Sequence, residues 1–235
     1  MADTQQPTEL FRISMNPSAE TTIIFLHGLF CSHFEFSLVV PYLTDYHLLL
    51  VDLPSHSRSR ASDSGPFTLT NYAARVASFI RNNAHNGCAH VVGLSTGGFV
   101  GMQLAAHDSE LVSGTTPFQG YQHWLATHPR ALYPLIAATA TCIPNSAYHW
   151  ATGRIGLLPH DELYVEMQLN FSFELVKRGY GEFALEGSVS ALERAGVRTL
   201  VLVGEVVDAR TAGLTGPLLR ENGSPESKAV LIKTA

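Results

Sequence analysis

Short apolar runs recur along this chain, and segments with helical periodicity follow several of them. The apolar runs cover 21–26, 47–52, 89–94, 197–203 and 228–233, and the helical segments cover 71–83, with Thr70 as N-cap, and 98–107. Short runs that are apolar throughout are typical of strands in a parallel sheet, because helices bury both faces of such a sheet. The alternation therefore predicts an α/β protein whose mostly parallel sheet is flanked by helices.

This alternation stops between residues 119 and 186. The region contains both tryptophans, Trp124 and Trp150, several tyrosines and helical pieces, but no clear buried strand. We expect it to be a helical cap inserted over one end of the sheet. The predicted core then consists of residues 1–118 and 187–235, and the predicted cap of residues 119–186. The aromatic side chains of the cap would either line an apolar pocket or pack the cap onto the core.

The composition limits the partners of the chain. Of its 235 residues, 46% are hydrophobic and 15% are charged, and the formal net charge of −5 argues against nucleic acid as a partner. Cys31, Cys88 and Cys142 are odd in number and widely spaced, as expected for reduced thiols in the cytosol. The N-terminus lacks the pattern of a signal peptide, and no run reaches the roughly 18 apolar residues that a membrane span needs. We therefore expect a cytoplasmic protein with no membrane span.

The sequence carries no recognisable cofactor motif. It has no HExxH spacing, no GxGxxG motif and no P-loop. These are patterns by which many metal, dinucleotide and nucleotide sites are recognised. We expect neither a metal nor an organic cofactor.

The stretch GLSTG, residues 93–97, places a serine between two glycines where the run 89–94 meets a helical segment. A sharp strand-to-helix turn of this kind holds the serine in a strained conformation, with its hydroxyl exposed above the sheet. Glycines are needed on both sides because side chains there would collide with the adjacent strand and helix. The following helix also directs backbone N–H groups at developing negative charge. The pattern predicts an exposed nucleophile at Ser95; the alternative is an ordinary glycine-rich turn.

Three motifs resemble the α/β-hydrolase superfamily, in particular its cap-bearing single-domain serine hydrolase group. They are His27-Gly28 after the first apolar run, DLPSHSRS at 52–59 after the second, and GLSTGG at 93–98. The resemblance covers about residues 21–233 and implies the α/β-hydrolase fold. The stretch 52–59 departs from the family in carrying Ser55 and Ser57 where glycines are common. We expect His56 within it to be a solvated loop residue.

The resemblance implies a catalytic site built around the serine. Ser95 would be the nucleophile, and the backbone N–H of Thr96 would be one donor of the oxyanion hole. The second donor would be the backbone N–H of Leu29, with that of Phe30 as the alternative. His27 would be structural, with its ring tying the turn together.

The same resemblance implies an acid and a histidine, in the chain order Ser, acid, His. Asp208 follows the run 197–203 and is the favoured acid, with Glu205 as the alternative acid and a surface carboxylate without a role as a further one. The histidine would follow the last strand, yet only Thr234 and Ala235 come after Lys233.

The missing histidine bears on activity, because a serine hydroxyl needs an adjacent base to accept its proton. We therefore expect either a truncated product of a longer hydrolase or a catalytically impaired protein. A third alternative is a cap histidine that turns toward the serine; the candidates are His123, His128, His149 and His160, the last histidine of the sequence.

These observations predict a serine hydrolase that acts on a small-molecule apolar ester, carboxylic or thioester, through an acyl-enzyme at Ser95, impaired by the absent histidine. The competing hypothesis is a catalytically inactive accessory or binding protein on the same fold. The absent histidine supports it, and the intact GLSTGG motif opposes it. We also expect self-association, because without a closing helix the apolar residues Val201, Leu202, Val230 and Ile232 would be exposed.

Overall fold

The fold is described by a computed structural model. It describes residues 9–60, 65–118, 160–172, 200–204 and 228–232, together with 144, 146–147, 149–150, 175 and 196–197. Among these residues, no helix is both long and apolar enough to cross a membrane.

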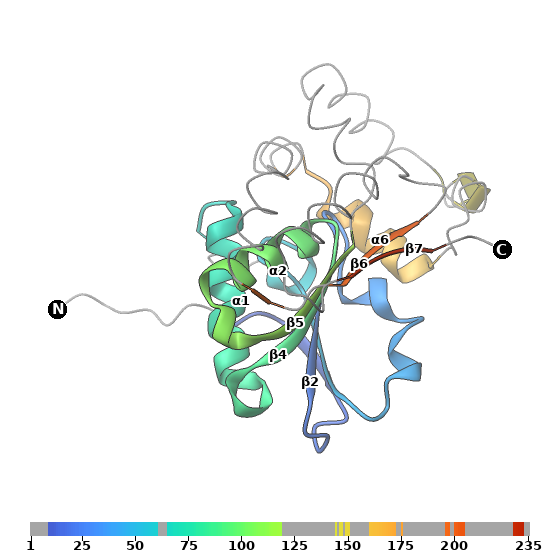
Figure 1. The fold of residues 1–235 in the computed structure, drawn as a ribbon. Coiled ribbons are helices and arrows are strands. Elements are labelled where there is room, and N and C mark those ends of the chain that lie inside the picture. Colours follow the sequence, from blue (N-terminus) through green and yellow to red (C-terminus); the bar gives the residue numbers. More distant parts are fainter. Residues whose placement is uncertain are drawn as a thin grey trace.

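In the part of the chain that the structure describes, seven strands form one sheet in the order β1-β3-β2-β4-β5-β6-β7 (Figure 1). The strands are β1 (Arg12–Met15), β2 (Thr22–Leu26), β3 (His47–Val51), β4 (Ala89–Leu94), β5 (Val112–Phe118), β6 (Leu200–Gly204) and β7 (Lys228–Ile232). Every neighbouring pair is parallel except β1 with β3. The predicted mostly parallel sheet is therefore confirmed. Because parallel strands end at the same edge, the loops after β2, β3 and β4 meet there.

The helices whose bounds lie within the described residues are α1 (Leu69–Asn83), α2 (Thr96–His107) and α6 (Asp161–Asn170), with short 3-10 helices η1 (His33–Phe36), η2 (Val40–Tyr42), η3 (Ser57–Ser59), η4 (His85–Gly87) and η5 (Ser109–Leu111). The predicted N-cap of the first helix is wrong. Thr68, not Thr70, caps α1, because its side chain accepts a hydrogen bond from the backbone N–H of Asn71. The second helix begins at Thr96 rather than Gly98, so no loop separates it from Ser95.

Alternate residues of the central strands face two separate layers of the core. Ile24 and Leu26 of β2 belong to the cluster that α1 and α2 complete. Phe25, between them, packs in a second cluster with Phe36 and Val40 from the segment of η1 and η2. Figure 1 shows α1 and α2 on one side of the sheet and the blue η1–η2 segment on the other. This sandwich explains why the residues of β2 after Thr22 are all apolar.

Two strands, β1 and β5, were not predicted from the sequence because neither is a continuous apolar run. In β1 the residues alternate between exposed and half-buried, as fits an antiparallel strand at a sheet edge. The sequence of β5, VSGTTPF, contains a glycine, a proline and three hydroxyl residues, which are not typical of a buried strand. Both lie in the sheet because they pair with strongly apolar neighbours, β3 and β4.

The predicted cap, 119–186, lies largely outside the described residues. Its best-described helix is α6, which contacts η1 and η3 of the core. The boundaries 1–118, 119–186 and 187–235 therefore stay a prediction. The burial of residues on β6 and β7 also lies outside what is described, so the expected exposed patch at Val201, Leu202, Val230 and Ile232 stays a prediction too.

Candidate active site

The chain turns sharply between β4 and α2. Leu94 ends the strand, Thr96 begins the helix, and Ser95 between them has φ 53° and ψ −113°. A positive φ brings the Cβ of a non-glycine residue close to its own backbone, so such residues are uncommon and strained. The predicted strained turn at Ser95 is therefore present.

Two glycines make this turn feasible. A Cβ at Gly93 would overlap the backbone of Gly97, and a Cβ at Gly97 would overlap the carbonyl oxygen of Leu26 on β2. Both overlaps are with backbone atoms, in the first turn of α2 and at the end of β2, so they cannot be relieved by moving a side chain alone. The prediction that side chains at these positions would collide with the helix and the neighbouring strand is confirmed.

The loop after β2 lies directly against this turn. The N–H of Gly97 donates a hydrogen bond to the carbonyl oxygen of His27, with an N···O distance of 3.1 Å. Ser95 Cβ lies 3.5 Å from the point that a Cβ at Gly28 would occupy. From Gly28 the chain forms a tight turn, in which the N–H of Cys31 donates to the Gly28 carbonyl oxygen at 3.1 Å and Phe30 has φ 69°. The structure thus brings Ser95 and Thr96 next to the loop that carries Leu29.

The ring of His27 joins two loops at the edge of the sheet. Its Nε2 accepts a hydrogen bond from the backbone N–H of Leu53 at 2.9 Å, and its Nδ1–H donates to the Gly28 carbonyl oxygen at 2.7 Å. Burial is the main reason that the pKa of His27 is lowered to about 4. A neutral ring with both nitrogens engaged at neutral pH is what the expected structural role requires.

The expectation that His56 is solvated is wrong. Its side chain is fully buried, with its Nδ1 2.8 Å from the carbonyl oxygen of Pro54 and its ring edge-on to that of His27. Burial chiefly lowers its pKa to about 3, so the ring is neutral. Its Nε2 is buried without a hydrogen-bond partner, so the inward position of the ring depends on the contact with Pro54 and on packing against His27.

A buried carboxylate stabilises the same region. Asp52 Oδ1 accepts hydrogen bonds from the ring and the backbone N–H of His33 at 2.8 and 2.9 Å, and its Oδ2 accepts from the N–H of Arg58 at 3.2 Å. Burial by itself would raise the pKa of Asp52, but the hydrogen bonds from His33 lower it below its ordinary value. Asp52 therefore fixes the loops after β2 and β3 to each other.

A second carboxyl group lies beside the turn. Glu35 Oε2 accepts a hydrogen bond from the N–H of Gly28 at 2.6 Å, and Oε1 lies 3.5 Å from the point that a Cβ at Gly28 would occupy. Burial raises the pKa of Glu35 to about 7. Burial and the neighbouring Glu35 also raise the pKa of the Cys31 thiol, which disfavours a reactive thiolate there.

Sequence reasoning missed two of the residues that shape this site. Glu35 is preceded and followed by phenylalanines in HFEF, and a lone charged residue between apolar ones was the one local signal. Asn170 closes α6 and contacts both loops over more than a hundred residues of sequence, for which there was no local signal.

The remaining predicted residues fall into two groups. Asp208, Glu205, His123 and His128 lie outside the described residues. The described cap histidines bind acidic or backbone groups of α6: His149 Nε2 lies 2.7 Å from Asp161 Oδ1, and His160 Nδ1 accepts from the N–H of Leu163 at 3.3 Å.

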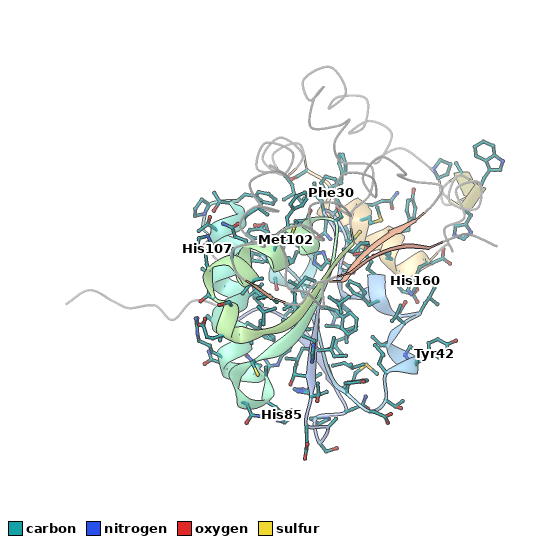
Figure 2. The ribbon with its side chains drawn as sticks, viewed as in Figure 1. Phe30, Tyr42, His85, Met102, His107 and His160 are labelled. Carbon is teal, nitrogen blue, oxygen red and sulfur yellow. The ribbon has the colours of Figure 1, made fainter. Side chains whose placement is uncertain are left out.

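In Figure 2, Phe30 marks the end of the sheet where the loops after β2, β3 and β4 meet, and His85 lies at the other end, where its ring packs on His47.

Within the described parts of the chain, no three His, Cys, Asp or Glu side chains are grouped so that they could hold a metal ion.

Comparisons with known proteins point to one family. The profile of the alpha/beta hydrolase family matches residues 23–224. An AB hydrolase superfamily protein of Gibberella zeae is 40% identical over 107 residues, which cover 45% of this chain and 37% of that protein. A 2-succinyl-6-hydroxy-2,4-cyclohexadiene-1-carboxylate synthase of Pectobacterium atrosepticum is 47% identical over 45 residues, 19% of this chain and 18% of that protein. The matched segments therefore span well under half of these relatives.

Solved structures share the fold. The crystal structure of a lipase-esterase related protein from Clostridium acetobutylicum superposes with a TM-score of 0.71 and covers 97% of this chain and 91% of that one. The two sequences are 19% identical. The similarity is therefore one of architecture, and the chemistry has to be argued from the residues of this chain.

Proposed function

We propose that this chain, which belongs to the alpha/beta hydrolase family, is a serine hydrolase that acts on carboxylic esters or thioesters through an acyl-enzyme at Ser95. The observation that carries the proposal is the positive φ of Ser95 between two glycines that the surrounding backbone requires. Such strain costs on the order of 1–3 kcal/mol, and it is found mostly where a site uses it.

The proposed reaction has two steps. Ser95 Oγ attacks the carbonyl carbon of the ester, its proton passes to a base, and the alcohol or thiol leaves as the acyl-enzyme forms. Water then attacks the acyl-enzyme, releasing the carboxylic acid and restoring the serine. In both steps the backbone N–H groups of Thr96 and Leu29 would stabilise the oxyanion, with Phe30 as the alternative to Leu29.

The acid and the base complete the proposal. We assign the acid to Asp208, ahead of Glu205, and its role is to orient a histidine. Members of this family order their triad as Ser, acid, His, and the last histidine among the 235 residues is His160. We therefore propose that these residues by themselves hydrolyse esters slowly, since removal of one triad member leaves only a residual rate enhancement.

The substrate is proposed to be a small apolar ester or acyl compound. Its support is the composition of 119–186, where both tryptophans and several tyrosines are concentrated. The formal net charge of −5 does not favour a polyanionic partner. Cytoplasmic location and self-association remain part of the proposal.

A non-catalytic binding or accessory protein is the second candidate. The observation that favours it is the state of the described cap histidines, which are bound within their own region. His149 pairs with Asp161. His160 is the N-cap of α6, and its Nδ1 lies 3.2 Å from Glu162 Oε2. Neither arrangement is typical of a general base poised beside a serine.

Labelling with a fluorophosphonate probe separates the two candidates. The hydrolase proposal expects slow covalent labelling of the wild-type protein that is lost in Ser95→Ala and retained in Ser109→Ala, an exposed serine of η5. A folded wild-type sample that stays unlabelled would reject the hydrolase proposal for these residues and favour the binding protein. p-Nitrophenyl esters of increasing chain length would then define the acyl preference of a labelled enzyme.

A further inference from the structure

Asn170 is a buried polar residue that the hydrolase mechanism does not use. It is the last residue of α6, and its side chain is 4% exposed. A carboxamide in such a place must satisfy its hydrogen bonds within the protein, because an unpaired buried polar group is costly. Its partners come from two loops of the core rather than from its own helix.

The nitrogen of this side chain faces the loop after β2. Nδ2 lies 2.8 Å from the carbonyl oxygen of Phe30 and 2.9 Å from that of Cys31, and 2.9 Å from Ser57 Oγ. Carbonyl oxygens only accept hydrogen bonds, so Nδ2 must be the donor to both.

The oxygen of the side chain faces the loop after β3. Oδ1 accepts a hydrogen bond from the backbone N–H of Ser57 at 2.6 Å and from Arg60 Nη2 at 2.8 Å. Rotating the amide by half a turn would set an oxygen against two carbonyls and a nitrogen against two donors. The orientation of Asn170 is therefore fixed by its surroundings.

These contacts hold the turn that lies against Ser95. The turn from Gly28 to Cys31 has Phe30 at φ 69°, a conformation that a phenylalanine does not adopt without support. Asn170 binds both carbonyl groups at the far end of the turn, and Glu35 binds the N–H of Gly28 at its near end. Leu29 lies between the two anchors.

We propose that Asn170 is the positioning residue of the oxyanion hole: its carboxamide fixes the Phe30–Cys31 end of the turn and thereby the direction of the Leu29 N–H. This inference rests on the proposed function of Ser95 and Leu29. It makes α6, a helix of the predicted cap, part of the machinery that sets the reaction rate. Oxyanion donors act through preorganisation, so a displaced turn lowers the rate without a missing catalytic group.

Asn170→Asp tests this proposal selectively. The aspartate keeps an oxygen for Ser57 and Arg60, but it places a second oxygen against the carbonyls of Phe30 and Cys31. The contact of α6 with the loop after β3 therefore survives, whereas the contact with the turn becomes repulsive. Asn83→Asp is the matched control, because Asn83 donates one hydrogen bond to the carbonyl oxygen of Phe79 on the remote helix α1.

Two measurements would be made on the full chain. The first is the saturation kinetics of fluorophosphonate labelling, for which we expect the maximal rate to fall about 10- to 100-fold in Asn170→Asp. The probe concentration at half-saturation should stay within about twofold, because the proposed role of Asn170 is in the reaction of the bound probe and not in its binding. The second is hydrogen exchange, for which we expect about tenfold faster exchange in peptides covering residues 28–33 and unchanged exchange in α1.

A merely structural role predicts a different pattern. Val76→Ala removes buried volume from α1, where Val76 is fully buried, and so destabilises the protein without touching the turn. If Val76→Ala lowers the maximal labelling rate as much as Asn170→Asp does, the proposal is overturned. It is also overturned if Asn170→Asp folds, labels and exchanges like the wild-type protein.

If the wild-type protein is not labelled, the hydrolase proposal fails, and the exchange measurement alone decides whether Asn170 fixes the turn. If Asn170→Asp does not fold, Asn170→Ala replaces it, since alanine removes the donor without adding repulsion. If neither variant folds, Asn170 serves stability and not positioning, and the proposal is rejected.

Discussion

The backbone N–H of Gly28 donates a hydrogen bond to Oε2 of Glu35, with 2.6 Å between nitrogen and oxygen. Ser95 Cβ lies 3.5 Å from the point that a Cβ at the same glycine would occupy. Burial raises the pKa of the Glu35 carboxyl to about 7. A group that titrates near neutral pH therefore lies beside the strained serine.

Glu35→Gln should remove one pH dependence from the free energy of unfolding. The folded protein keeps the proton of Glu35 up to a pH of about 7, whereas an ordinary glutamate loses it near 4.5. Because the folded state binds more protons between these values, stability falls as pH rises from 4.5 to 7 and stays low above 7. The expected loss of stability is on the order of 1–3 kcal/mol. It is smaller than the full pKa shift would give, because the side chain is half-buried and solvent screens its charge.

Urea unfolding between pH 5 and pH 8 measures this effect as the difference between variant and wild type. Glutamine keeps an oxygen for the Gly28 N–H, so Glu35→Gln should gain stability relative to wild type as pH rises. Glu20→Gln, an exposed control, should show a constant difference. A constant difference for Glu35→Gln as well would contradict the raised pKa.

Gly97→Ala should destabilise the protein far more than an alanine at an ordinary glycine. Its Cβ would overlap the backbone of Leu26 in the central strand β2, which we expect to cost about 3 kcal/mol or more. Gly87→Ala is the control: it has φ 66° but its nearest neighbour is 3.8 Å away, so only the left-handed backbone costs energy, roughly 1 kcal/mol. Thermal unfolding compares the stabilities of the two variants. Equal losses of stability would show that β2 can move to accommodate the added Cβ.

His56→Phe should change the acid sensitivity of the fold. The pKa of His56 is lowered to about 3, below the ordinary 6.5. The unfolded chain therefore binds more protons between these values, and stability is lost as pH falls below 6.5. Phenylalanine loses the hydrogen bond to Pro54, about 1 kcal/mol at pH 7, but at pH 5 it escapes a penalty of roughly 2 kcal/mol.

Unfolding at pH 7 and pH 5 should thus reverse the order of wild type and His56→Phe. The exposed His107→Phe serves as the control, and we expect no reversal for it. If the wild type remains more stable than His56→Phe by the same margin at both pH values, the pKa of His56 is not lowered in the folded protein.

His160→Ala tests the cap histidine as a base. Because His160 Nδ1 accepts the N–H of Leu163 at the start of α6, its loss should lower stability by about 1 kcal/mol. The fluorophosphonate labelling rate of Ser95 should stay within about twofold of the wild-type rate. A tenfold or larger fall in a folded variant would instead identify His160 as the base of the site.

The sequence was sufficient for the features that the backbone itself dictates. A serine between two glycines at a strand–helix junction predicted the strained turn, because the overlap between positions 93 and 97 follows from local geometry. Runs of consecutive apolar residues predicted the central strands, because both faces of β2 and β3 are covered. These signals lie within a few residues of the feature that they predict.

Features that depend on distant partners were missed. His56 is buried with its Nδ1 against the carbonyl oxygen of Pro54 and its ring packed on His27, and the sequence of a loop does not reveal this. Asn170 meets Phe30 across 140 residues of sequence. The strand β5 is held by its pairing with β4 in spite of its polar composition.

The overlaps that shape the bend occur at positions 93 and 97, and none of them involves the side chain at 95. The bend therefore does not depend on which side chain stands at position 95. A thiol or a carboxylate there would be held by the same strand, helix and loop. The identity of the side chain at 95 can thus change by a single substitution, whereas a change of the bend would require the residues at 93 and 97 and the backbone around them to change together.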